Sequence, residues 1–98
     1  MTDADWPPPE ARTKAAVWRA EAHIERGEYA QAAHALEQVF GLGKDDELLR
    51  GLHHLAAAGW KHQEGEAESA RRQLDHARRR LGRRRSRLVA LVERELGS

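Results

Sequence analysis

Apolar residues recur at every third or fourth position along most of this 98-residue chain, and no segment alternates between apolar and polar residues as a β-strand does. A spacing of three and four places side chains on one face of an α-helix. Glycine, which commonly ends helices, follows each of the first four periodic stretches. The pattern therefore predicts an all-α protein with helices over residues 10–26, 28–40, 45 or 46 to 64, 66–81 and 83–96.

The densest apolar run lies in the middle of the chain, where residues 48–60 read LLRGLHHLAAAGW. This run is too short, and too polar at its edges, to cross a membrane. We expect it to form a helix near residues 46–64 that is buried on most sides, at the centre of a compact bundle of about five helices. Gly51 and Gly59 each cost about 1 kcal/mol relative to alanine inside a helix. Their expected compensation is close contact with the backbone of another helix.

The N-terminal residues differ in composition from the rest. Residues 1–9 contain Trp6 and all three prolines, Pro7, Pro8 and Pro9. We interpret this segment as a proline-rich arm that leads into the first helix, with Pro9 near the first helical position. The alternative is a polyproline ligand for an aromatic groove, although no PxxP pattern with specific flanks is present. Residues 10–98 are predicted to form one helical-bundle domain.

Composition excludes several classes of function. The chain has no cysteine, which rules out disulfides, thiol nucleophiles and thiolate metal sites. Its N-terminus is acidic with no apolar stretch behind it, and no segment is long and apolar enough to span a bilayer, so we expect a cytoplasmic protein without a membrane partner. The three serines, Ser69, Ser86 and Ser98, stand beside no obvious histidine and carboxylate pair. No phosphate-binding loop is present either, so we expect neither an enzyme nor a cofactor.

One group of polar residues has spacing compatible with a divalent metal ion. His34 and Glu37 are three residues apart and share a helix face, and His53 or His54 from the next helix could join them. Adjacent residues on a helix point about 100° apart, so only one of these two histidines can face the site. We take His34, Glu37 and His54 as the candidate ligands. The alternative is that Glu37 or a histidine makes a buried hydrogen bond and the others are solvated.

The most basic part of the chain is residues 71–87, which contain nine arginines and one acidic residue. The last arginines of the fourth predicted helix lie near its negative C-terminus, which is electrostatically favourable. Those at the start of the fifth helix lie near a positive N-terminus, which is unfavourable. Either the two helices run together or an anion occupies the site. This tract predicts weak, salt-dependent contact with an anion or the backbone of nucleic acid, without aromatic residues for stacking. The candidate contacts are Arg79, Arg80, Arg83, Arg84 and Arg85.

Charge is unevenly distributed, although the net charge is only +1. Residues 1–65 carry eleven acidic and seven basic residues, and residues 66–98 carry five acidic and ten basic residues. The arginine tract therefore has an alternative interpretation, as a solvated face partly paired with acids of the first part. The oppositely charged parts of two copies could also meet head to tail.

Trp18 and Trp60 lie on or beside apolar stripes, and each has two interpretations. Placement in the core is one of them. The other is an interaction role, because tryptophan is rarely buried completely and often anchors a partner or a symmetric dimer. A homodimer and an unknown protein partner are both open at this point.

Several short blocks of the sequence share their spacing with a known family. They are Gly27-Glu28-Tyr29, Ala32, Leu36-Glu37, Leu48-Leu49-Arg50-Gly51-Leu52, Leu55-Ala56-Ala57-Ala58, Gly65 and Ala70. In these blocks, over about residues 20–81, the chain resembles the domain of unknown function 309 family of small bacterial and archaeal proteins. The resemblance implies a compact helical bundle around a central helix, and it implies no established activity.

The chain departs from this family in one block. The family has a His-Glu pair before the Leu-Glu step and a tryptophan shortly after it, whereas this chain has Ala33-His34 and Phe40. Glu37 is the polar residue of that block that matches. Our leading hypothesis is accordingly a non-enzymatic protein-interaction or scaffold module. Contact with nucleic acid or an anion through residues 71–87 comes second, and a divalent metal site third.

Overall fold

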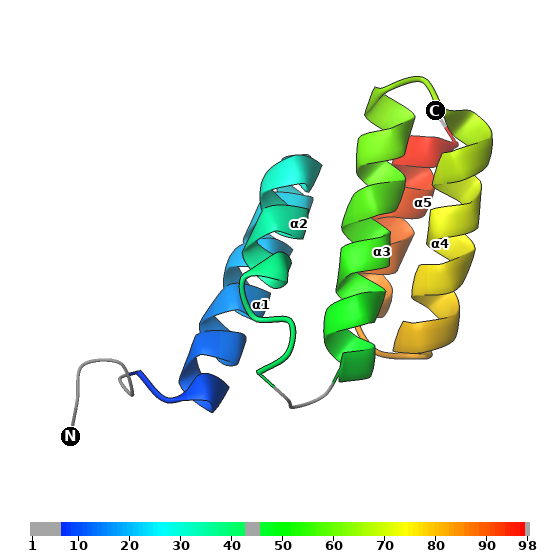
Figure 1. The fold of residues 1–98 in the computed structure, drawn as a ribbon. Helices are drawn as coiled ribbons and strands as arrows, with labels where there is room; N and C mark the ends of the chain where they lie inside the picture. Colours follow the sequence, from blue (N-terminus) through cyan, green and yellow to red (C-terminus); the bar gives the residue numbers. More distant parts are fainter. Residues whose placement is uncertain (1–6, 43–45, 98) are drawn as a thin grey trace.

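Five α-helices make up the computed structural model, which describes residues 7–42 and 46–97 (Figure 1). No strand occurs in these two segments, so the predicted all-α class is confirmed. No helix among them has the length and apolar character needed to cross a membrane. The helices are α1 (Pro9–Glu25), α2 (Tyr29–Glu37), α3 (Asp46–Gln63), α4 (Ala67–Leu81) and α5 (Ser86–Leu96).

Helix α3 lies at the centre of the bundle, as its dense apolar run predicts. It contacts each of the four other helices, and its contact with α4 is the most extensive. Helices α1 and α2 form a hairpin on one side of α3, while α4 and α5 pack on the other (Figure 1). One continuous hydrophobic core joins the two sides. Its largest fully buried side chains are Ile24, Leu36, Leu49, Leu52, Leu55, Leu81 and Val92.

Two glycines of α3 make room for large side chains of neighbouring helices. A Cβ atom at Gly59 would lie 2.4 Å from the ring of Tyr29, and one at Gly51 would lie 2.6 Å from the side chain of Leu81. Both distances are shorter than van der Waals contact allows. The prediction that the backbone of another helix lies against these glycines was wrong, because their close neighbours are side chains.

The turns after α1 and α3 are built in the same way. Gly27 and Gly65 both have a positive φ, of 76° and 82°, which glycine adopts without strain. After α1, the Glu28 N–H donates to the carbonyl of His23 over 2.8 Å. After α3, the Glu66 N–H donates to the carbonyl of Lys61 over 2.9 Å. This 6→1 bond is the mark of a Schellman motif, which satisfies a carbonyl that the helix leaves without a partner.

Two predicted helix boundaries differ from the structure by three residues, and the others agree to within one residue. Helix α2 ends at Glu37 and not at Phe40, because the Val39 N–H donates to Leu36 and starts a tighter turn (3.1 Å). Helix α5 begins at Ser86 and not at Arg83. Residues 82–85 form a turn between α4 and α5, so these two helices do not run together. Arg85 closes the turn with a φ of 58°, a left-handed conformation that no right-handed helix can contain.

Candidate interaction surface on α1

Helix α1 has an inner and an outer apolar stripe. The inner stripe, Ala16, Val17, Ala20 and Ile24, is buried. The outer stripe consists of Ala11, Ala15, Trp18 and Ala22, spaced four, three and four residues apart. Trp18 is 75% exposed, so its placement in the core is wrong. Side chains on opposite sides of one helix cannot both face the same core. Ala11 of the outer stripe is exposed as well, and Ala15 and Ala22 are half-buried.

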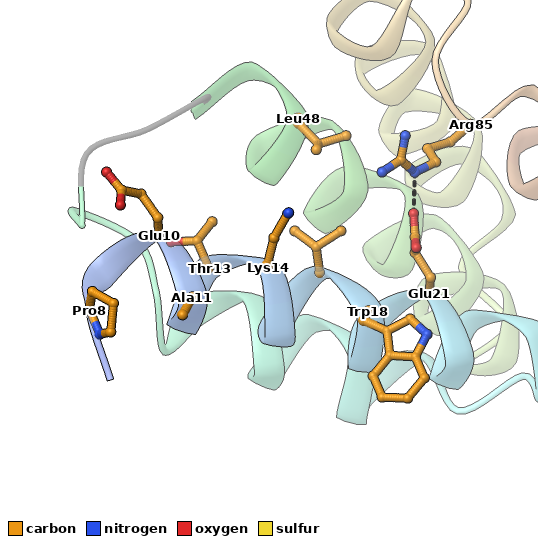
Figure 2. Close-up of a pocket in the computed structure, with 10 residues that line it drawn as sticks. Pro8, Glu10, Ala11, Thr13, Lys14, Trp18, Glu21, Leu48 and Arg85 are labelled. Carbon is orange, nitrogen blue, oxygen red and sulfur yellow. Dashed lines mark hydrogen bonds and ion pairs between the residues drawn. The ribbon is translucent and has the colours of Figure 1, made fainter. Parts of the chain in front are cut away.

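An apolar groove of about 680 Å³ lies beside Trp18 (Figure 2). Val17 of α1 and Leu48 of α3 contribute apolar side chains to it, and Pro8 and Ala11 line it near the start of α1. Because Val17 and Leu48 belong to the buried core, the groove opens onto apolar groups that are fixed in position. It therefore offers a preformed surface to an apolar side chain.

Ion pairs join α1 to the start of α5 and to the residue before it, and one of these pairs, Glu21 with Arg85, lines the groove. Glu21 accepts a hydrogen bond from Arg85 Nε (Figure 2), and Glu25 one turn later accepts a hydrogen bond from Arg87. Arg85 holds this position from its left-handed backbone conformation. The two carboxylates of α1 next to the outer stripe are therefore already paired with arginines.

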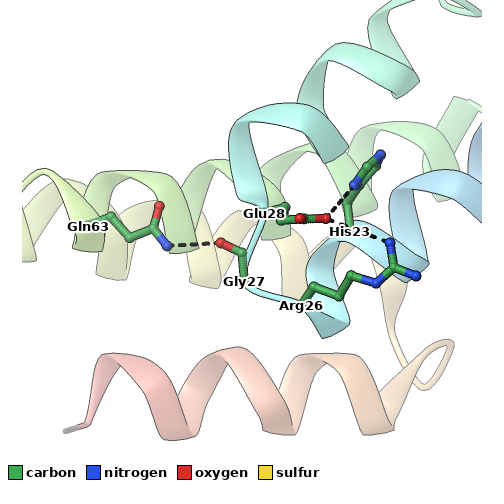
Figure 3. Close-up of polar contacts among 5 residues, drawn as sticks. All are labelled: His23, Arg26, Gly27, Glu28 and Gln63. Carbon is green, nitrogen blue, oxygen red and sulfur yellow. Dashed lines mark hydrogen bonds and ion pairs between the residues drawn. The ribbon is translucent and has the colours of Figure 1, made fainter.

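The C-terminal end of α1 is held by a second set of polar contacts (Figure 3). Glu28 accepts a hydrogen bond from His23 Nδ1 over 2.8 Å and lies 4.0 Å from Arg26. The side chain of Gln63, at the end of α3, donates to the carbonyl of Gly27 over 2.9 Å. These contacts fix the α1–α2 turn on α3, so the outer stripe belongs to a helix that is anchored near its C-terminal end.

Three cations on the outer part of α1 have no ion-pair partner among the residues that the structure describes. Arg12, Lys14 and Arg19 form no ion pair with any residue of segments 7–42 and 46–97, and all three are exposed. Arg19 donates only to the carbonyl of Ala15 within its own helix, over 3.4 Å. Glu10 lines the groove as Lys14 does, and it forms no ion pair within the described segments. Sequence reasoning missed these cations, although the seven-residue spacing of Arg12 and Arg19 marks a common ridge.

Trp60, the other tryptophan proposed as an anchor, is placed differently. It lies in the last two turns of α3 and is 41% exposed. It does not line the groove beside Trp18. The two tryptophans therefore do not form one surface around this groove, and Trp60 provides a natural comparison for experiments on Trp18.

Several arginines of residues 71–87 are paired within the molecule. Arg80 Nη1 lies 3.0 Å from Glu47 Oε1, and Arg78 Nη2 lies 2.6 Å from Glu93 Oε2. Arg85 and Arg87 add the pairs with α1 described above. Three of these four partners belong to residues 1–65. Ion pairs within the fold therefore neutralise part of the charge asymmetry between the two parts of the sequence. Among the candidate anion contacts, Arg79 and Arg83 are exposed at the α4–α5 turn.

The three candidate metal ligands are not brought together. Glu37 Oε2 lies 2.8 Å from Nε2 of His53, whereas His54 Nδ1 donates to Gln73 on α4 over 2.7 Å. His34 accepts a hydrogen bond from Gln38 over 3.2 Å. Within the described segments, no group of three histidine, cysteine, aspartate or glutamate side chains could hold a metal ion.

The divergence of the two adjacent histidines explains this result. Because α3 packs between α2 and α4, two successive residues that point about 100° apart reach different neighbours. His53 faces α2, and His54 faces α4, where its ring centre lies 5.1 Å from that of His76. Burial lowers the pKa of His54, the hydrogen bond that its ring donates to Gln73 opposes this shift, and the nearby charge of His76 adds to it.

Comparison with models of protein families, with curated proteins and with solved structures finds no match to this chain.

Proposed function

We propose that this chain is a non-enzymatic protein-interaction module, and that its docking surface is the outer stripe of α1 together with the groove beside it. The exposure of Trp18 is the observation that carries the proposal. A side chain of this size leaves a large apolar area in water, and an exposed tryptophan beside an apolar groove is typical of a binding anchor.

The free energy that burial of its indole would release supports an anchor role for Trp18. Covering an exposed indole removes on the order of 150 Å² from water, which is worth about 4 kcal/mol before the cost of association. The indole sits on a helix that ion pairs and the Gln63 contact hold in place. Because little order has to be created on binding, more of this free energy is available for affinity.

The resemblance to the domain of unknown function 309 family is compatible with this proposal. What that resemblance implies is a helical bundle without an established activity, so it neither supplies nor opposes a docking role. We propose membership of this family on the residue blocks given above and derive the docking role from α1 alone.

The proposal can be tested without knowing the natural partner. A display library of random peptides of about 16 residues, long enough for four helical turns, would be selected on the wild type. Selected peptides would then be measured on Trp18→Ala and on Trp60→Ala, which removes the other exposed indole. We expect peptides whose binding is lost in Trp18→Ala and kept in Trp60→Ala. Failure to enrich any peptide, or peptides that bind both variants equally, would refute the docking surface.

A second candidate function is salt-dependent contact with nucleic acid at the α4–α5 turn. The exposure of Arg79 and Arg83 favours it, whereas the internal pairing of Arg78 and Arg80 reduces the charge available. Its test is a mobility shift with mixed duplex DNA and structured RNA at low and moderate salt. Arg79→Gln with Arg83→Gln should abolish a shift that depends on this turn. A shift that is insensitive to salt, or no shift at low salt, would contradict this candidate.

A further inference from the structure

The charged side chains around the groove beside Trp18 indicate which class of partner the groove binds. This step rests on the proposed function, and it asks which chemical class of partner would fit the surface. Apolar side chains are required in any case, because Val17, Trp18 and Leu48 present carbon atoms to the groove. The charged side chains around them decide the rest.

The acids of this surface are mostly neutralised from within. Glu21 and Glu25 are paired with Arg85 and Arg87 of the α5 region, so they offer a partner little free negative charge. Glu10 at the start of α1 is the remaining acid on this side of the helix.

Among the described residues, the charges around the stripe that have no ion-pair partner are mostly positive. Lys14 lines the groove one turn before Trp18, and Arg12 and Arg19 flank the outer stripe on its other side. None of these three cations has an ion-pair partner in the two described segments. An acidic partner would pair with them, whereas a basic one would be repelled.

We propose that this surface docks an acidic amphipathic helical segment of another protein, with its apolar side chains on Val17, Trp18 and Leu48 and its carboxylates beside Arg12, Lys14 and Arg19. A helix in a groove is a recurrent mode of peptide recognition, with anchors spaced three and four residues apart. The stripe on α1 has this spacing and gives such anchors a matching surface.

A second copy of this chain fits the surface less well. In a symmetric dimer it would bring the same three cations to the interface and repel its partner. Nucleic acid also fits less well, because aliphatic side chains such as Val17 and Leu48 give no hydrogen bond to a phosphate or a base edge. An acidic segment with an apolar face uses both the groove and the cations.

The experiment uses three synthetic peptides of about 16 residues, a length of four helical turns. The first has leucines spaced three and four residues apart and glutamates elsewhere. The second replaces the glutamates by lysines. The third has the composition of the first in a scrambled order without an apolar face. Binding is followed on the full chain through the backbone amide signals of α1 in NMR spectra, which every variant retains. The indole N–H of Trp18 is a further signal where Trp18 is present, with Trp60 as internal reference.

We expect the acidic amphipathic peptide to bind and the other two peptides to fail. Trp18→Ala should weaken binding by about 30-fold or more, as expected for a central anchor. The triple variant Arg12→Glu, Lys14→Glu, Arg19→Glu should weaken it by about tenfold and should instead bind the lysine peptide. Raising the salt from about 0.05 to about 0.5 M should weaken binding of the acidic peptide to the wild type. It should strengthen binding of the same peptide to the triple variant, because salt screens an attraction in the first case and a repulsion in the second. Circular dichroism would establish that each variant remains helical.

The outcomes separate this inference from the proposed function. A lysine peptide that binds the wild type through Trp18 would overturn the acidic partner and leave the docking surface standing. Failure of both amphipathic peptides at millimolar concentration would overturn the inference; if the display library also yielded no Trp18-dependent peptide, both proposals would fall. A concentration-dependent mass that Trp18→Ala abolishes would assign the surface to a second copy. Displacement of the peptide by duplex RNA would assign it to nucleic acid.

The chain's own residues 1–6 are a further competitor, because they contain two aspartates and Trp6. A Trp6→Ala variant should bind the acidic peptide with the affinity of the wild type. A gain of about tenfold would show that these residues occupy the groove, and it would overturn a surface open to a partner.

Discussion

Two aromatic side chains of this protein, Tyr29 and Trp18, both lie beside small residues on a helix, but they have opposite environments. Tyr29 lies against Gly59 of α3 and is 2% exposed. Trp18 lies among the alanines of the outer stripe of α1 and is 75% exposed. The difference is that another helix, α2, carries Tyr29 onto α3, whereas no described element lies over α1 at Trp18.

This comparison shows that small residues leave space on a helix surface, and that the tertiary arrangement decides whether a large side chain of the same chain fills it. At Gly59 the ring of Tyr29 fills this space, and it packs so closely that a single methyl group on Gly59 would clash with it. On the outer side of α1, no side chain of another described element packs against Trp18, which is why we propose that a partner binds there. The stability and binding of the protein should therefore respond in opposite ways to changes at the two places.

The largest effect on stability is expected at Gly59. Gly59→Ala should lower the free energy of unfolding by about 2 kcal/mol or more, because the new methyl group meets the rigid Tyr29 ring inside the core. This loss would appear even though alanine favours a helix by about 1 kcal/mol over glycine. Urea unfolding measures the difference. In a Tyr29→Ala background the same change should become neutral or stabilising, and a loss of equal size there would show that the ring is not the cause.

The next effect concerns the backbone of Arg85, which borders the Trp18 groove. Arg85→Ala and Arg85→Gly both remove the ion pair with Glu21, but only glycine adopts the left-handed conformation without strain. The glycine variant should therefore be more stable than the alanine variant by about 1 kcal/mol. Equal free energies of unfolding for the two variants in urea would contradict a left-handed residue at this position.

A third prediction concerns the hydroxyl group of Tyr29. This oxygen is buried and has no hydrogen-bond partner within the residues that the structure describes. Burial, with a smaller contribution from Glu95, raises the pKa of Tyr29 above its ordinary value. Tyr29→Phe keeps the ring against Gly59 and removes the unpaired hydroxyl, so it should raise the free energy of unfolding by about 1 kcal/mol. A clear loss of stability in thermal unfolding would mean that the hydroxyl has a partner.

A smaller effect is expected from pH at the contact between α3 and α4. Because burial lowers the pKa of His54, the folded protein takes up this proton at a lower pH than the unfolded chain. The contribution of His54 is complete above its unfolded value of about 6.5 and is lost as the pH falls through the folded pKa. Urea unfolding at pH 7 and pH 5 should show a smaller loss of stability for His54→Gln than for the wild type. The same pH dependence in both proteins would contradict the shift.

The smallest effect on stability is expected at Trp18, which completes the comparison with Gly59. Trp18→Ala removes the more exposed of the two tryptophans that the structure describes, and it should change the free energy of unfolding by less than about 0.5 kcal/mol. Adding one methyl group at Gly59 would thus cost more than removing the whole indole at Trp18. A loss of several kcal/mol in Trp18→Ala would show that the outer stripe of α1 is covered within the protein itself.

The amino-acid sequence by itself determined the helices, their order and the core. The spacing of three and four residues selects the buried side chains of α1, α3 and α4, because this periodicity is a local property of helix geometry. The glycines after α1 and α3 likewise end their helices through the backbone freedom of the residue itself. The dense apolar run of residues 48–60 was sufficient to place α3 at the centre.

Only the tertiary structure decided what each polar or aromatic side chain faces. Nothing in the local pattern distinguishes His53 from His54, and the packing of α3 between α2 and α4 sends the first to Glu37 and the second to Gln73. The ion pairs between α5 and α1 join residues more than sixty positions apart. Whether Trp18 enters the core depends on which side of α1 the other helices occupy. These outcomes rest on contacts between segments distant in the sequence, which periodicity along a single helix does not specify.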